Sequence, residues 1–219
     1  MPRPNLKESK KRTCWIFISS EKAYICTPVL SDFLTQTNFF KSGMRQIHDR
    51  HFDIFISSDK IQERVRQLAA TINTDYKDKE PLFLSILNGA FIFTADLVRS
   101  VTIPAEVSFI KLKSYRKMES SGKVAELLGL EHDLANRHVI IVEDIVDTGK
   151  TLDHILAEFG ALGAQSIEIF SLLFKPDASA FPINLKYIGF EIPNRFVVGY
   201  GLDYDGYGRN LKDIYKVID

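Results

Sequence analysis

Cysteine is scarce in this sequence, and its scarcity limits the chemistry open to most of the chain. Only two of the 219 residues are cysteines, Cys14 and Cys26, and both precede Met44. From Met44 onward no thiol is present to form a disulfide, ligate zinc or attack a substrate as a nucleophile. This usage fits a reducing compartment, and we expect a cytoplasmic location.

Excess charge and long apolar runs are also absent. Basic and acidic side chains number 28 each, so the chain lacks the basic excess with which proteins usually bind nucleic-acid phosphates. No apolar run approaches the roughly 20 residues of a membrane helix, and Trp15–Ile18 is too short for a secretory core. We therefore expect no nucleic-acid partner and no membrane association.

The first 43 residues differ from the rest of the chain. They hold seven basic and three acidic side chains, which leaves 21 bases and 25 acids from Met44 onward. They also lack sustained periodicity. We predict an N-terminal extension over residues 1–43, either disordered or preceding the true start, and one domain over residues 44–219. The alternative of a short helix over Val29–Phe40, docked on the domain, stays open.

Strand-like and helix-like patterns alternate along this domain. Leu82–Leu87 is apolar on both faces, which is typical of a strand buried in a parallel sheet. Predicted strands are 52–56, 82–87, 107–112, 138–142 and 166–174, and predicted helices begin near Ser57 or Ser58, Phe91 and Thr151. The alternation predicts an α/β fold, a mostly parallel sheet flanked by helices.

The most informative segment is Val139–Thr151. A buried strand is followed by the acids Glu143, Asp144 and Asp147, and then by a Thr-Gly-Lys-Thr turn that opens a helix. The amides and hydroxyls of such a turn, together with the helix dipole, suit a phosphate. The acids would repel a phosphate, so they should accept hydrogen bonds from sugar hydroxyls or act through Mg²⁺. The segment predicts a sugar-phosphate site.

Two other nucleotide motifs fail on their spacing. Residues 149–151 resemble the end of a Walker A loop, but that loop needs Gly where Asp144 stands. Residues 199–201 resemble the start of a dinucleotide fingerprint, which needs Gly where Tyr204 stands. Neither motif is therefore present.

Residues 143–151, Glu-Asp-Ile-Val-Asp-Thr-Gly-Lys-Thr, resemble the phosphoribosyl-pyrophosphate signature of type I phosphoribosyltransferases. Other segments resemble the hypoxanthine-guanine phosphoribosyltransferases within that family, and the likeness covers roughly residues 48–218. These segments are Leu112–Tyr115, Ser171–Lys175, Gly189–Pro193 and Phe196–Tyr204.

The resemblance carries several expectations about the whole enzyme. It implies the type I phosphoribosyltransferase fold with a small base-binding hood and a mobile loop, here Ser114–Lys123. It implies purine salvage, in which phosphoribosyl pyrophosphate and hypoxanthine or guanine give IMP or GMP and pyrophosphate. It also implies a Mg²⁺ cofactor and a homodimer or homotetramer.

The same resemblance, taken position by position, implies three subsites and a metal site. The phosphoribosyl group would be held by Glu143, Asp144, Asp147, Thr148, Gly149, Lys150 and Thr151. The base would be held by Lys175, Phe196 and Val197, and pyrophosphate by Asn88, Gly89, Ser114, Tyr115 and Arg209. The metal ligands would be Asp203, Glu143 and Asp144. Asp147 would be the catalytic residue, accepting the N7 proton of the base.

Physical chemistry makes the implied base site selective. A lysine donates to the 6-oxo group of a purine but not to the 6-amino group of adenine, and an aromatic face suits a flat base. We therefore expect adenine to be a poor substrate. Without the resemblance, Lys175 alone would be interpreted as a strand-end charge and Phe196 as a core residue.

One position departs from the family pattern. Asn88 stands where many relatives carry lysine, so the pyrophosphate loop loses a positive charge. The resemblance also suggests a cis peptide between Asn88 and Gly89, which would direct a backbone N–H at pyrophosphate.

Two other functions remain to be weighed. A regulator that senses phosphoribosyl pyrophosphate would share the fold, but it should carry a basic surface, whereas residues 44–219 are mildly acidic. A transferase for another base, such as uracil, would need different contacts near Lys175 and Phe196. We therefore predict a 6-oxopurine enzyme, with the preference among hypoxanthine, guanine and xanthine left open.

Overall fold

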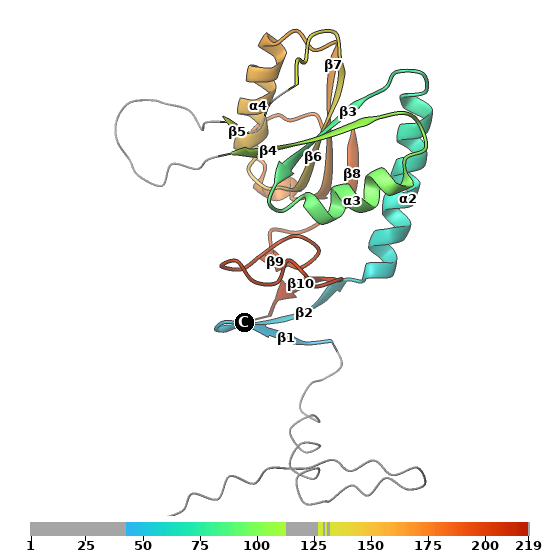
Figure 1. Cartoon of the computed structure of the whole chain (residues 1–219). Coiled ribbons are helices and arrows are strands. Elements are labelled where there is room, and N and C mark those ends of the chain that lie inside the picture. Colours follow the sequence, from blue (N-terminus) through green and yellow to red (C-terminus); the bar gives the residue numbers. More distant parts are fainter. Residues whose placement is uncertain (1–42, 113–126, 129, 131, 219) are drawn as a thin grey trace, which may run out of the picture. The chain divides into compact units, whose positions relative to one another are not determined.

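The structure is a computed structural model that describes residues 43–112, 127–128, 130 and 132–218 (Figure 1). The predictions for residues 1–42 and for the loop Ser114–Lys123 lie outside the described residues. Among the described residues, the first element is β1 (Arg45–Ile47), one residue after Met44.

A six-stranded sheet forms the larger part of the described fold. Its order is β5-β4-β3-β6-β7-β8, and all neighbours from β4 to β8 pair in parallel, whereas β5 pairs with β4 antiparallel. The strands are β3 (Leu82–Leu87), β4 (Glu106–Leu112), β5 (Leu127–Leu128), β6 (His138–Val146), β7 (Ser166–Phe174) and β8 (Tyr187–Glu191). The predicted mostly parallel sheet is confirmed.

Helices cover both faces of this sheet (Figure 1). The helices α2 (Ser58–Asp75) and α3 (Phe91–Ser100) share one apolar core with Ile140 of β6, whereas α4 (Lys150–Ala161) shares the other core with Ile141. Adjacent residues of a strand point to opposite faces, which places Ile140 and Ile141 in different cores. None of the described helices is long and apolar enough to span a membrane.

Both the local sequence and a tertiary contact stabilise helix α2. Its buried side chains are the ones that the helical spacing predicts: Ile61, Val65, Leu68, Ala69 and Ile72. Its N-terminus is not capped by the side chain of Ser57. Instead the Ser58 N–H donates to Asp213 Oδ1 at 2.7 Å, so a residue near the C-terminus satisfies the first turn.

A second, antiparallel sheet combines the two ends of the described chain. Its order is β1-β2-β10-β9, with β2 (Arg50–Ile56), β9 (Val197–Val198) and β10 (Ile214–Val217). We call this sheet, with loop residues 199–213, the hood. The strand predicted from Phe52 is confirmed, and it lies in the hood rather than in the parallel sheet. The short 3-10 helix η2 (Pro176–Ala178) follows β7.

Candidate active site

The strand order reverses between β3 and β6, and the candidate site lies at this reversal. From β3 the chain passes through α3 to β4 on one side, and from β6 it passes through α4 to β7 on the other. Such a reversal opens a crevice at the carboxyl ends of parallel strands, where ligands bind in open α/β sheets. The segments at this edge are Asn88–Gly89 after β3 and Asp147–Gly149 after β6.

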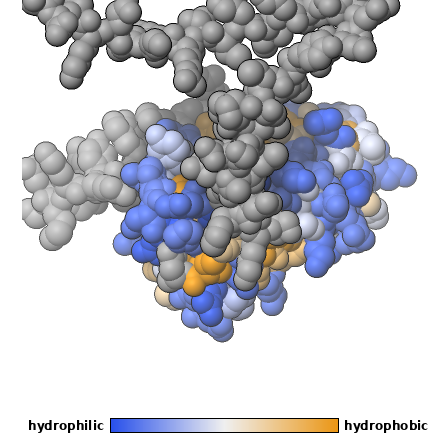
Figure 2. Space-filling model, turned by 90° about the horizontal axis from the view of Figure 1, so that it is seen from below, coloured by the Kyte–Doolittle hydropathy of each residue, from blue (hydrophilic) through white to orange (hydrophobic). Residues whose placement is uncertain are grey.

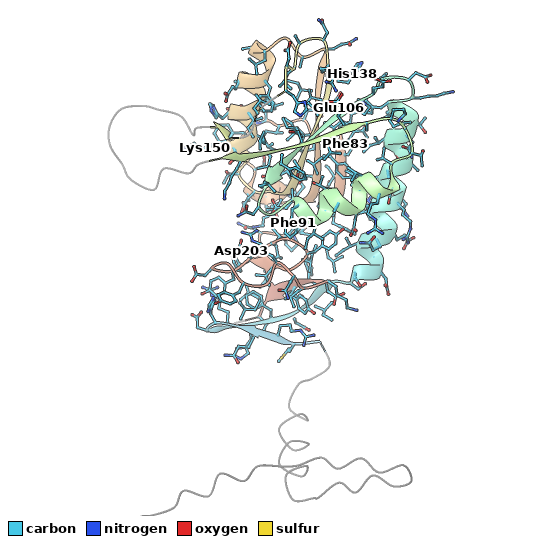
Figure 3. All side chains as sticks on the ribbon, viewed as in Figure 1. Phe83, Phe91, Glu106, His138, Lys150 and Asp203 are labelled. Carbon is cyan, nitrogen blue, oxygen red and sulfur yellow. The ribbon has the colours of Figure 1, made fainter. Side chains whose placement is uncertain are left out.

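Three segments distant in sequence meet closely in this crevice. A Cβ atom at Gly89 would lie 1.6 Å from Asp144 Oδ2, and a Cβ atom at Gly201 would lie 2.0 Å from the Gly89 carbonyl oxygen. Because neither position has room for a side chain, the loop after β3, the end of β6 and the hood can approach one another. In Figure 3, Asp203 and Phe91 lie toward the hood end of the sheet, and His138 and Glu106 toward its opposite end.

The acidic pair lies within β6 and not after it. The predicted strand ended at Val142, but β6 continues to Val146, because Ile145 and Val146 still pair with β7. The prediction followed the apolar run alone, whereas a central strand between two partners keeps its hydrogen bonds through polar residues. Glu143 and Asp144 are consequently held by a rigid element.

Burial perturbs both of these carboxyl groups. Within the described residues, Glu143 Oε2 is buried without a hydrogen-bond partner, and burial followed by the charge of Asp144 raises the pKa of Glu143 well above its usual range. Burial also raises the pKa of Asp144 to about 6, although the N–H of Ile145 at 3.0 Å and the charge of Arg209 oppose the shift. Glu143 Oε2 therefore lacks a donor, which a ligand can supply.

The predicted phosphate turn opens α4 and borders a small pocket. Gly149 has a left-handed φ of 82°, and the Ala180 N–H donates to the Thr148 carbonyl at 3.1 Å. The pocket measures about 90 Å³ and is lined by Glu143, Ile145, Val146, Asp147, Thr148, Gly149, Thr151 and Leu152. That volume equals about three waters, enough for one phosphate-sized group at a helix N-terminus.

Lys175, predicted for the base site, and Asp147, predicted as the catalytic residue, form an ion pair at the ends of β6 and β7. Lys175 Nζ lies 2.9 Å from Asp147 Oδ2. The lysine side chain is only 8% exposed, whereas that of the aspartate is 48% exposed. The Lys175 N–H donates to the Val146 carbonyl at 3.0 Å, which holds the two strand ends together. The pair therefore presents one donor and one acceptor at the edge of the sheet.

Val197 is the first residue of β9 in the hood, and Phe196 immediately precedes it. Phe196 is 41% exposed, and its ring meets Tyr204 edge-on at 5.6 Å and Phe52 at 6.3 Å. Val197 is buried in β9. The aromatic neighbours fix the ring of Phe196 and leave part of it accessible.

Asp203 and Arg209 form a second ion pair in the hood. Arg209 Nη2 lies 2.5 Å from Asp203 Oδ1, and Arg209 Nη1 donates to the Gly201 carbonyl at 2.7 Å. Asp203 Oδ2 accepts from the Gly206 N–H at 2.7 Å. Arg209 is thus fixed from two sides. In the described part of the chain, no three His, Cys, Asp or Glu side chains come together as a metal site.

The structure corrects one prediction for the pyrophosphate loop. The cis peptide bond joins Leu87 to Asn88, not Asn88 to Gly89, so the predicted position was wrong by one residue. At Gly89 the close packing against Asp144 and Gly201 constrains the backbone instead. Ser114 and Tyr115 lie outside the described residues.

The structure also reveals polar residues that the sequence did not indicate. Tyr200 of the hood donates to Asp96 of α3, and Gln62 of α2 reaches the same carboxylate. Asp96 and Gln62 lie among ordinary helix positions, and no local pattern could have linked them to Tyr200, which is 104 residues beyond Asp96 and 138 beyond Gln62.

The comparisons with known proteins agree with this geometry. Residues 57–205 match the phosphoribosyl transferase domain family. The match spans more than half of the chain, so the chain belongs to the phosphoribosyltransferase family and is a transferase. This confirms the family predicted from residues 143–151, and the predicted fold class with it.

Within that family, the chain is similar to hypoxanthine-guanine phosphoribosyltransferases. That of Mycobacterium avium is 38% identical over 168 residues, covering 74% of this chain and 83% of the relative. That of Bacillus subtilis is 39% identical over 159 residues, covering 72% and 88%. The crystal structure of a Bacillus anthracis hypoxanthine-guanine phosphoribosyltransferase aligns with a TM-score of 0.71 at 34% identity, covering 76% of this chain and 98% of that one.

Proposed function

We propose that this enzyme transfers the 5-phosphoribosyl group of phosphoribosyl pyrophosphate to hypoxanthine or guanine, giving IMP or GMP and pyrophosphate. The observation that carries the proposal is the ion pair of Lys175 and Asp147 beside the phosphate turn. A 6-oxopurine offers an acceptor at O6 and a donor at N7–H. It can therefore replace both partners of the pair, with Lys175 turning to O6 and Asp147 to N7.

The same pair gives a reason for base selectivity. Adenine would place its 6-amino donor against Lys175, which is also only a donor, so one buried polar group would lose its partner. The exposed part of Phe196 would lie on the base, and the backbone of Val197 would read its edge. These contacts distinguish purines by hydrogen bonding as well as by size.

The phosphoribosyl group would bind along β6 and the following turn. Glu143 and Asp144 would accept hydrogen bonds from the two ribose hydroxyls, which supplies the donor that Glu143 Oε2 lacks. The residues of the turn, Asp147, Thr148, Gly149, Lys150 and Thr151, would hold the 5-phosphate at the N-terminus of α4. As pyrophosphate leaves, positive charge grows on the ribose ring, and the adjacent carboxylates stabilise it.

Pyrophosphate would lie between the loop after β3 and the hood. Asn88, Gly89 and Arg209 supply donors there, and we propose the same for Ser114 and Tyr115. A bound Mg²⁺ would neutralise charge on the leaving pyrophosphate. Asp203, with Glu143 and Asp144, provides the hard oxygen ligands that Mg²⁺ prefers. In the described chain these three carboxylates do not form one cluster, so an ion bound there would need further ligands from phosphates and water.

Asp147 would be the catalytic residue that accepts the N7 proton as the glycosidic bond forms. Its carboxylate is half exposed and within reach of the base site through Lys175. The Asp147→Asn variant should lower kcat about a hundredfold and change the KM for hypoxanthine little, because the amide keeps the shape but not the basicity.

A panel of bases tests the proposed function directly. The full chain is incubated with phosphoribosyl pyrophosphate, Mg²⁺ and each of hypoxanthine, guanine, xanthine, adenine and uracil, and nucleotide and pyrophosphate are measured. We expect turnover of hypoxanthine or guanine at a kcat/KM at least about a hundredfold above that of adenine. Turnover of adenine equal to that of hypoxanthine would refute the role of Lys175. The absence of turnover with every base would refute the proposed enzymatic function.

We also propose that the enzyme works as a homodimer or homotetramer. Phe91 and Phe109 are 42% and 43% exposed and line one open pocket with Leu87 and Asn88, so apolar surface gathers beside the pyrophosphate loop. On the face seen in Figure 2, hydrophilic surface predominates and apolar surface forms small patches. Light scattering on the purified chain measures the mass, and a monomer at micromolar concentration would contradict this proposal.

A cytoplasmic location is the remaining part of the proposal. The donor and the nucleotide product carry several negative charges and do not cross a bilayer unaided, so the enzyme should work where they are made. Cell fractionation with an antibody against the chain measures the location.

A further inference from the structure

A part-buried polar cluster joins the hood to the two helices on one face of the parallel sheet. The Tyr200 hydroxyl donates to Asp96 Oδ2 of α3 at 2.7 Å. The Gln62 side-chain amide of α2 contacts the same oxygen and lies 3.4 Å from the Tyr200 hydroxyl. Tyr200 is only 3% exposed. A side chain of the hood is therefore held by two helices of the other lobe.

The Tyr200 hydroxyl remains a hydrogen-bond donor over the working pH range. Burial, followed by the hydrogen bond to Asp96, raises the pKa of the Tyr200 hydroxyl, which stays protonated and donating. An ionised acceptor shortens and strengthens the bond from a neutral hydroxyl. The contact is thus a fixed joint between the hood and α3.

The backbone of Tyr200 continues directly into the pyrophosphate side of the site. The Tyr200 N–H donates to the Leu211 carbonyl at 2.8 Å, and the Gly201 N–H to the Arg209 carbonyl at 3.0 Å. Gly201 packs on the Gly89 carbonyl and accepts from Arg209 Nη1. Tyr200 is therefore linked through Gly201 to the Arg209 guanidinium.

We propose that Gln62, Asp96 and Tyr200 form a positioning clamp, which holds the hood loop against the loop after β3 and so fixes Arg209 for pyrophosphate. The clamp residues act through Gly201 and Arg209 and do not touch the substrate. The inference rests on the proposed function, because it takes Arg209 as a pyrophosphate contact. It adds that α2 and α3 set the affinity for the leaving group.

The chain contains a matched control for this clamp. The Tyr187 hydroxyl donates to Asp75 Oδ2 at 2.6 Å, Tyr187 is also 3% exposed, and burial followed by that hydrogen bond raises its pKa. Tyr187 is the first residue of β8, at the opposite end of the parallel strands from the site. Removing its hydroxyl should cost similar stability and leave the site unchanged.

The test compares Tyr200→Phe with Tyr187→Phe in the full chain. For Tyr200→Phe we expect Mg²⁺-pyrophosphate affinity, by calorimetry, and the KM for phosphoribosyl pyrophosphate to worsen about tenfold, with the KM for hypoxanthine within about twofold. A tenfold loss is about the weight of one hydrogen bond to a charged group. Hydrogen exchange of residues 199–211 should also quicken. Tyr187→Phe should change none of these.

A second pair of variants separates positioning from folding. Asp96→Asn keeps an acceptor oxygen and should keep pyrophosphate affinity near that of the wild type, whereas Asp96→Leu should lose it about tenfold. Should Tyr200→Phe fail to fold, Gln62→Leu removes only the second contact and should weaken pyrophosphate about threefold.

The outcomes distinguish this inference from the proposed function. Equal pyrophosphate affinity and equal exchange in Tyr200→Phe, Tyr187→Phe and the wild type would overturn the clamp, as would an unaffected Gln62→Leu where that variant is the one tested. A wild type that binds pyrophosphate but converts no 6-oxopurine would overturn the proposed function, while the exchange and affinity differences would still establish the clamp.

Discussion

At the scale of single residues, the pair of Lys175 and Asp147 provides a hydrogen-bond donor and a hydrogen-bond acceptor side by side in one site. The lysine is buried and the aspartate is half exposed, so each neutralises the other until a ligand replaces both. A purine with a 6-oxo group and an N7 proton is complementary to this pair. Under the proposed function, the selectivity of the enzyme would therefore depend on a contact that exists before the base arrives.

Removing the lysine should reveal that dependence. In Lys175→Met, kcat/KM for hypoxanthine should fall about a hundredfold, because O6 loses its donor in a water-poor site, while turnover of adenine should fall much less. Steady-state kinetics with both bases measure the change. Lys186→Met, which removes a lysine paired with Asp75 and Glu168, is the control and should leave both values unchanged. An equal loss for both bases would contradict the base-reading role.

The two partly buried acids of β6 destabilise the unliganded enzyme when they ionise. Burial destabilises their ionised forms, so the folded chain binds protons more tightly at these groups than the unfolded chain does. For Asp144 the folded pKa is about 6, against an unfolded value of about 3.9. Its contribution to stability is therefore most favourable below about pH 4 and is lost as the pH rises through 6.

Binding of the donor should release protons at mildly acid pH. Ribose hydroxyls and Mg²⁺ favour the ionised carboxylates, so Mg²⁺-phosphoribosyl pyrophosphate should lower the pKa of Asp144 from about 6. Calorimetry at about pH 6 in two buffers of different ionisation enthalpy should show proton release, and at pH 8 it should show much less. Proton uptake at pH 6 would contradict the assignment.

Glu143 should show a trade between stability and function. Glu143→Gln removes a buried carboxyl group and should stabilise the unliganded protein at pH 7 by about 1 kcal/mol, raising Tm by a few degrees. The same variant should bind the donor at least about tenfold more weakly, since a ribose hydroxyl loses a charged acceptor. Thermal unfolding and calorimetry measure the two effects. A less stable variant with wild-type affinity would contradict this account.

At the scale of elements, periodicity and apolar runs were sufficient wherever local sequence decides the structure. The bounds of β3 and β7 and the buried face of α2 agree with the predictions. β6 was predicted too short, because its pairing with β7 and not its composition decides where it ends. The strands β9 and β10 were not predicted, since two to four residues beside a glycine-rich loop carry no periodic signal.

Close packing at the loop after β3 can be tested with a matched pair of glycines. In Gly89→Ala the new methyl group would lie 1.6 Å from Asp144 Oδ2, so the carboxylate or the loop must move. We expect the free energy of unfolding to fall by about 2 kcal/mol or more and the affinity for phosphoribosyl pyrophosphate to fall strongly. Gly160→Ala, in α4 with open space around it, should be neutral or stabilise by up to about 1 kcal/mol. Denaturant unfolding of both variants measures the difference.

At the scale of the whole molecule, the site depends on contacts that sequence patterns do not reveal. The hood pairs β2 with β10, and Asp213 caps α2 across 155 residues of sequence. The motif of residues 143–151 predicted the phosphate turn, because strand, turn and helix are contiguous there. The approach of Arg209 and Asp203 to that motif could not be predicted from the sequence, because it depends on the tertiary packing of Gly201 against Gly89.

The predicted domain boundary near Met44 leads to a prediction for the intact chain. The described contacts of the candidate site join residues within 43–218, so we expect that removing residues 1–42 leaves kcat/KM for hypoxanthine within about twofold and Tm within a few degrees. Kinetics and thermal unfolding of the shortened protein, compared with the full chain, measure this. A tenfold loss of activity would assign the first 42 residues a part in the site.

The most direct test of the central claim is a crystal structure of the full chain with Mg²⁺ and phosphoribosyl pyrophosphate. We predict the 5-phosphate on the amides of residues 147–151, the ribose hydroxyls on Glu143 and Asp144, and the pyrophosphate between Gly89 and Arg209. A donor bound elsewhere, with the turn at the start of α4 facing only solvent, would contradict the account.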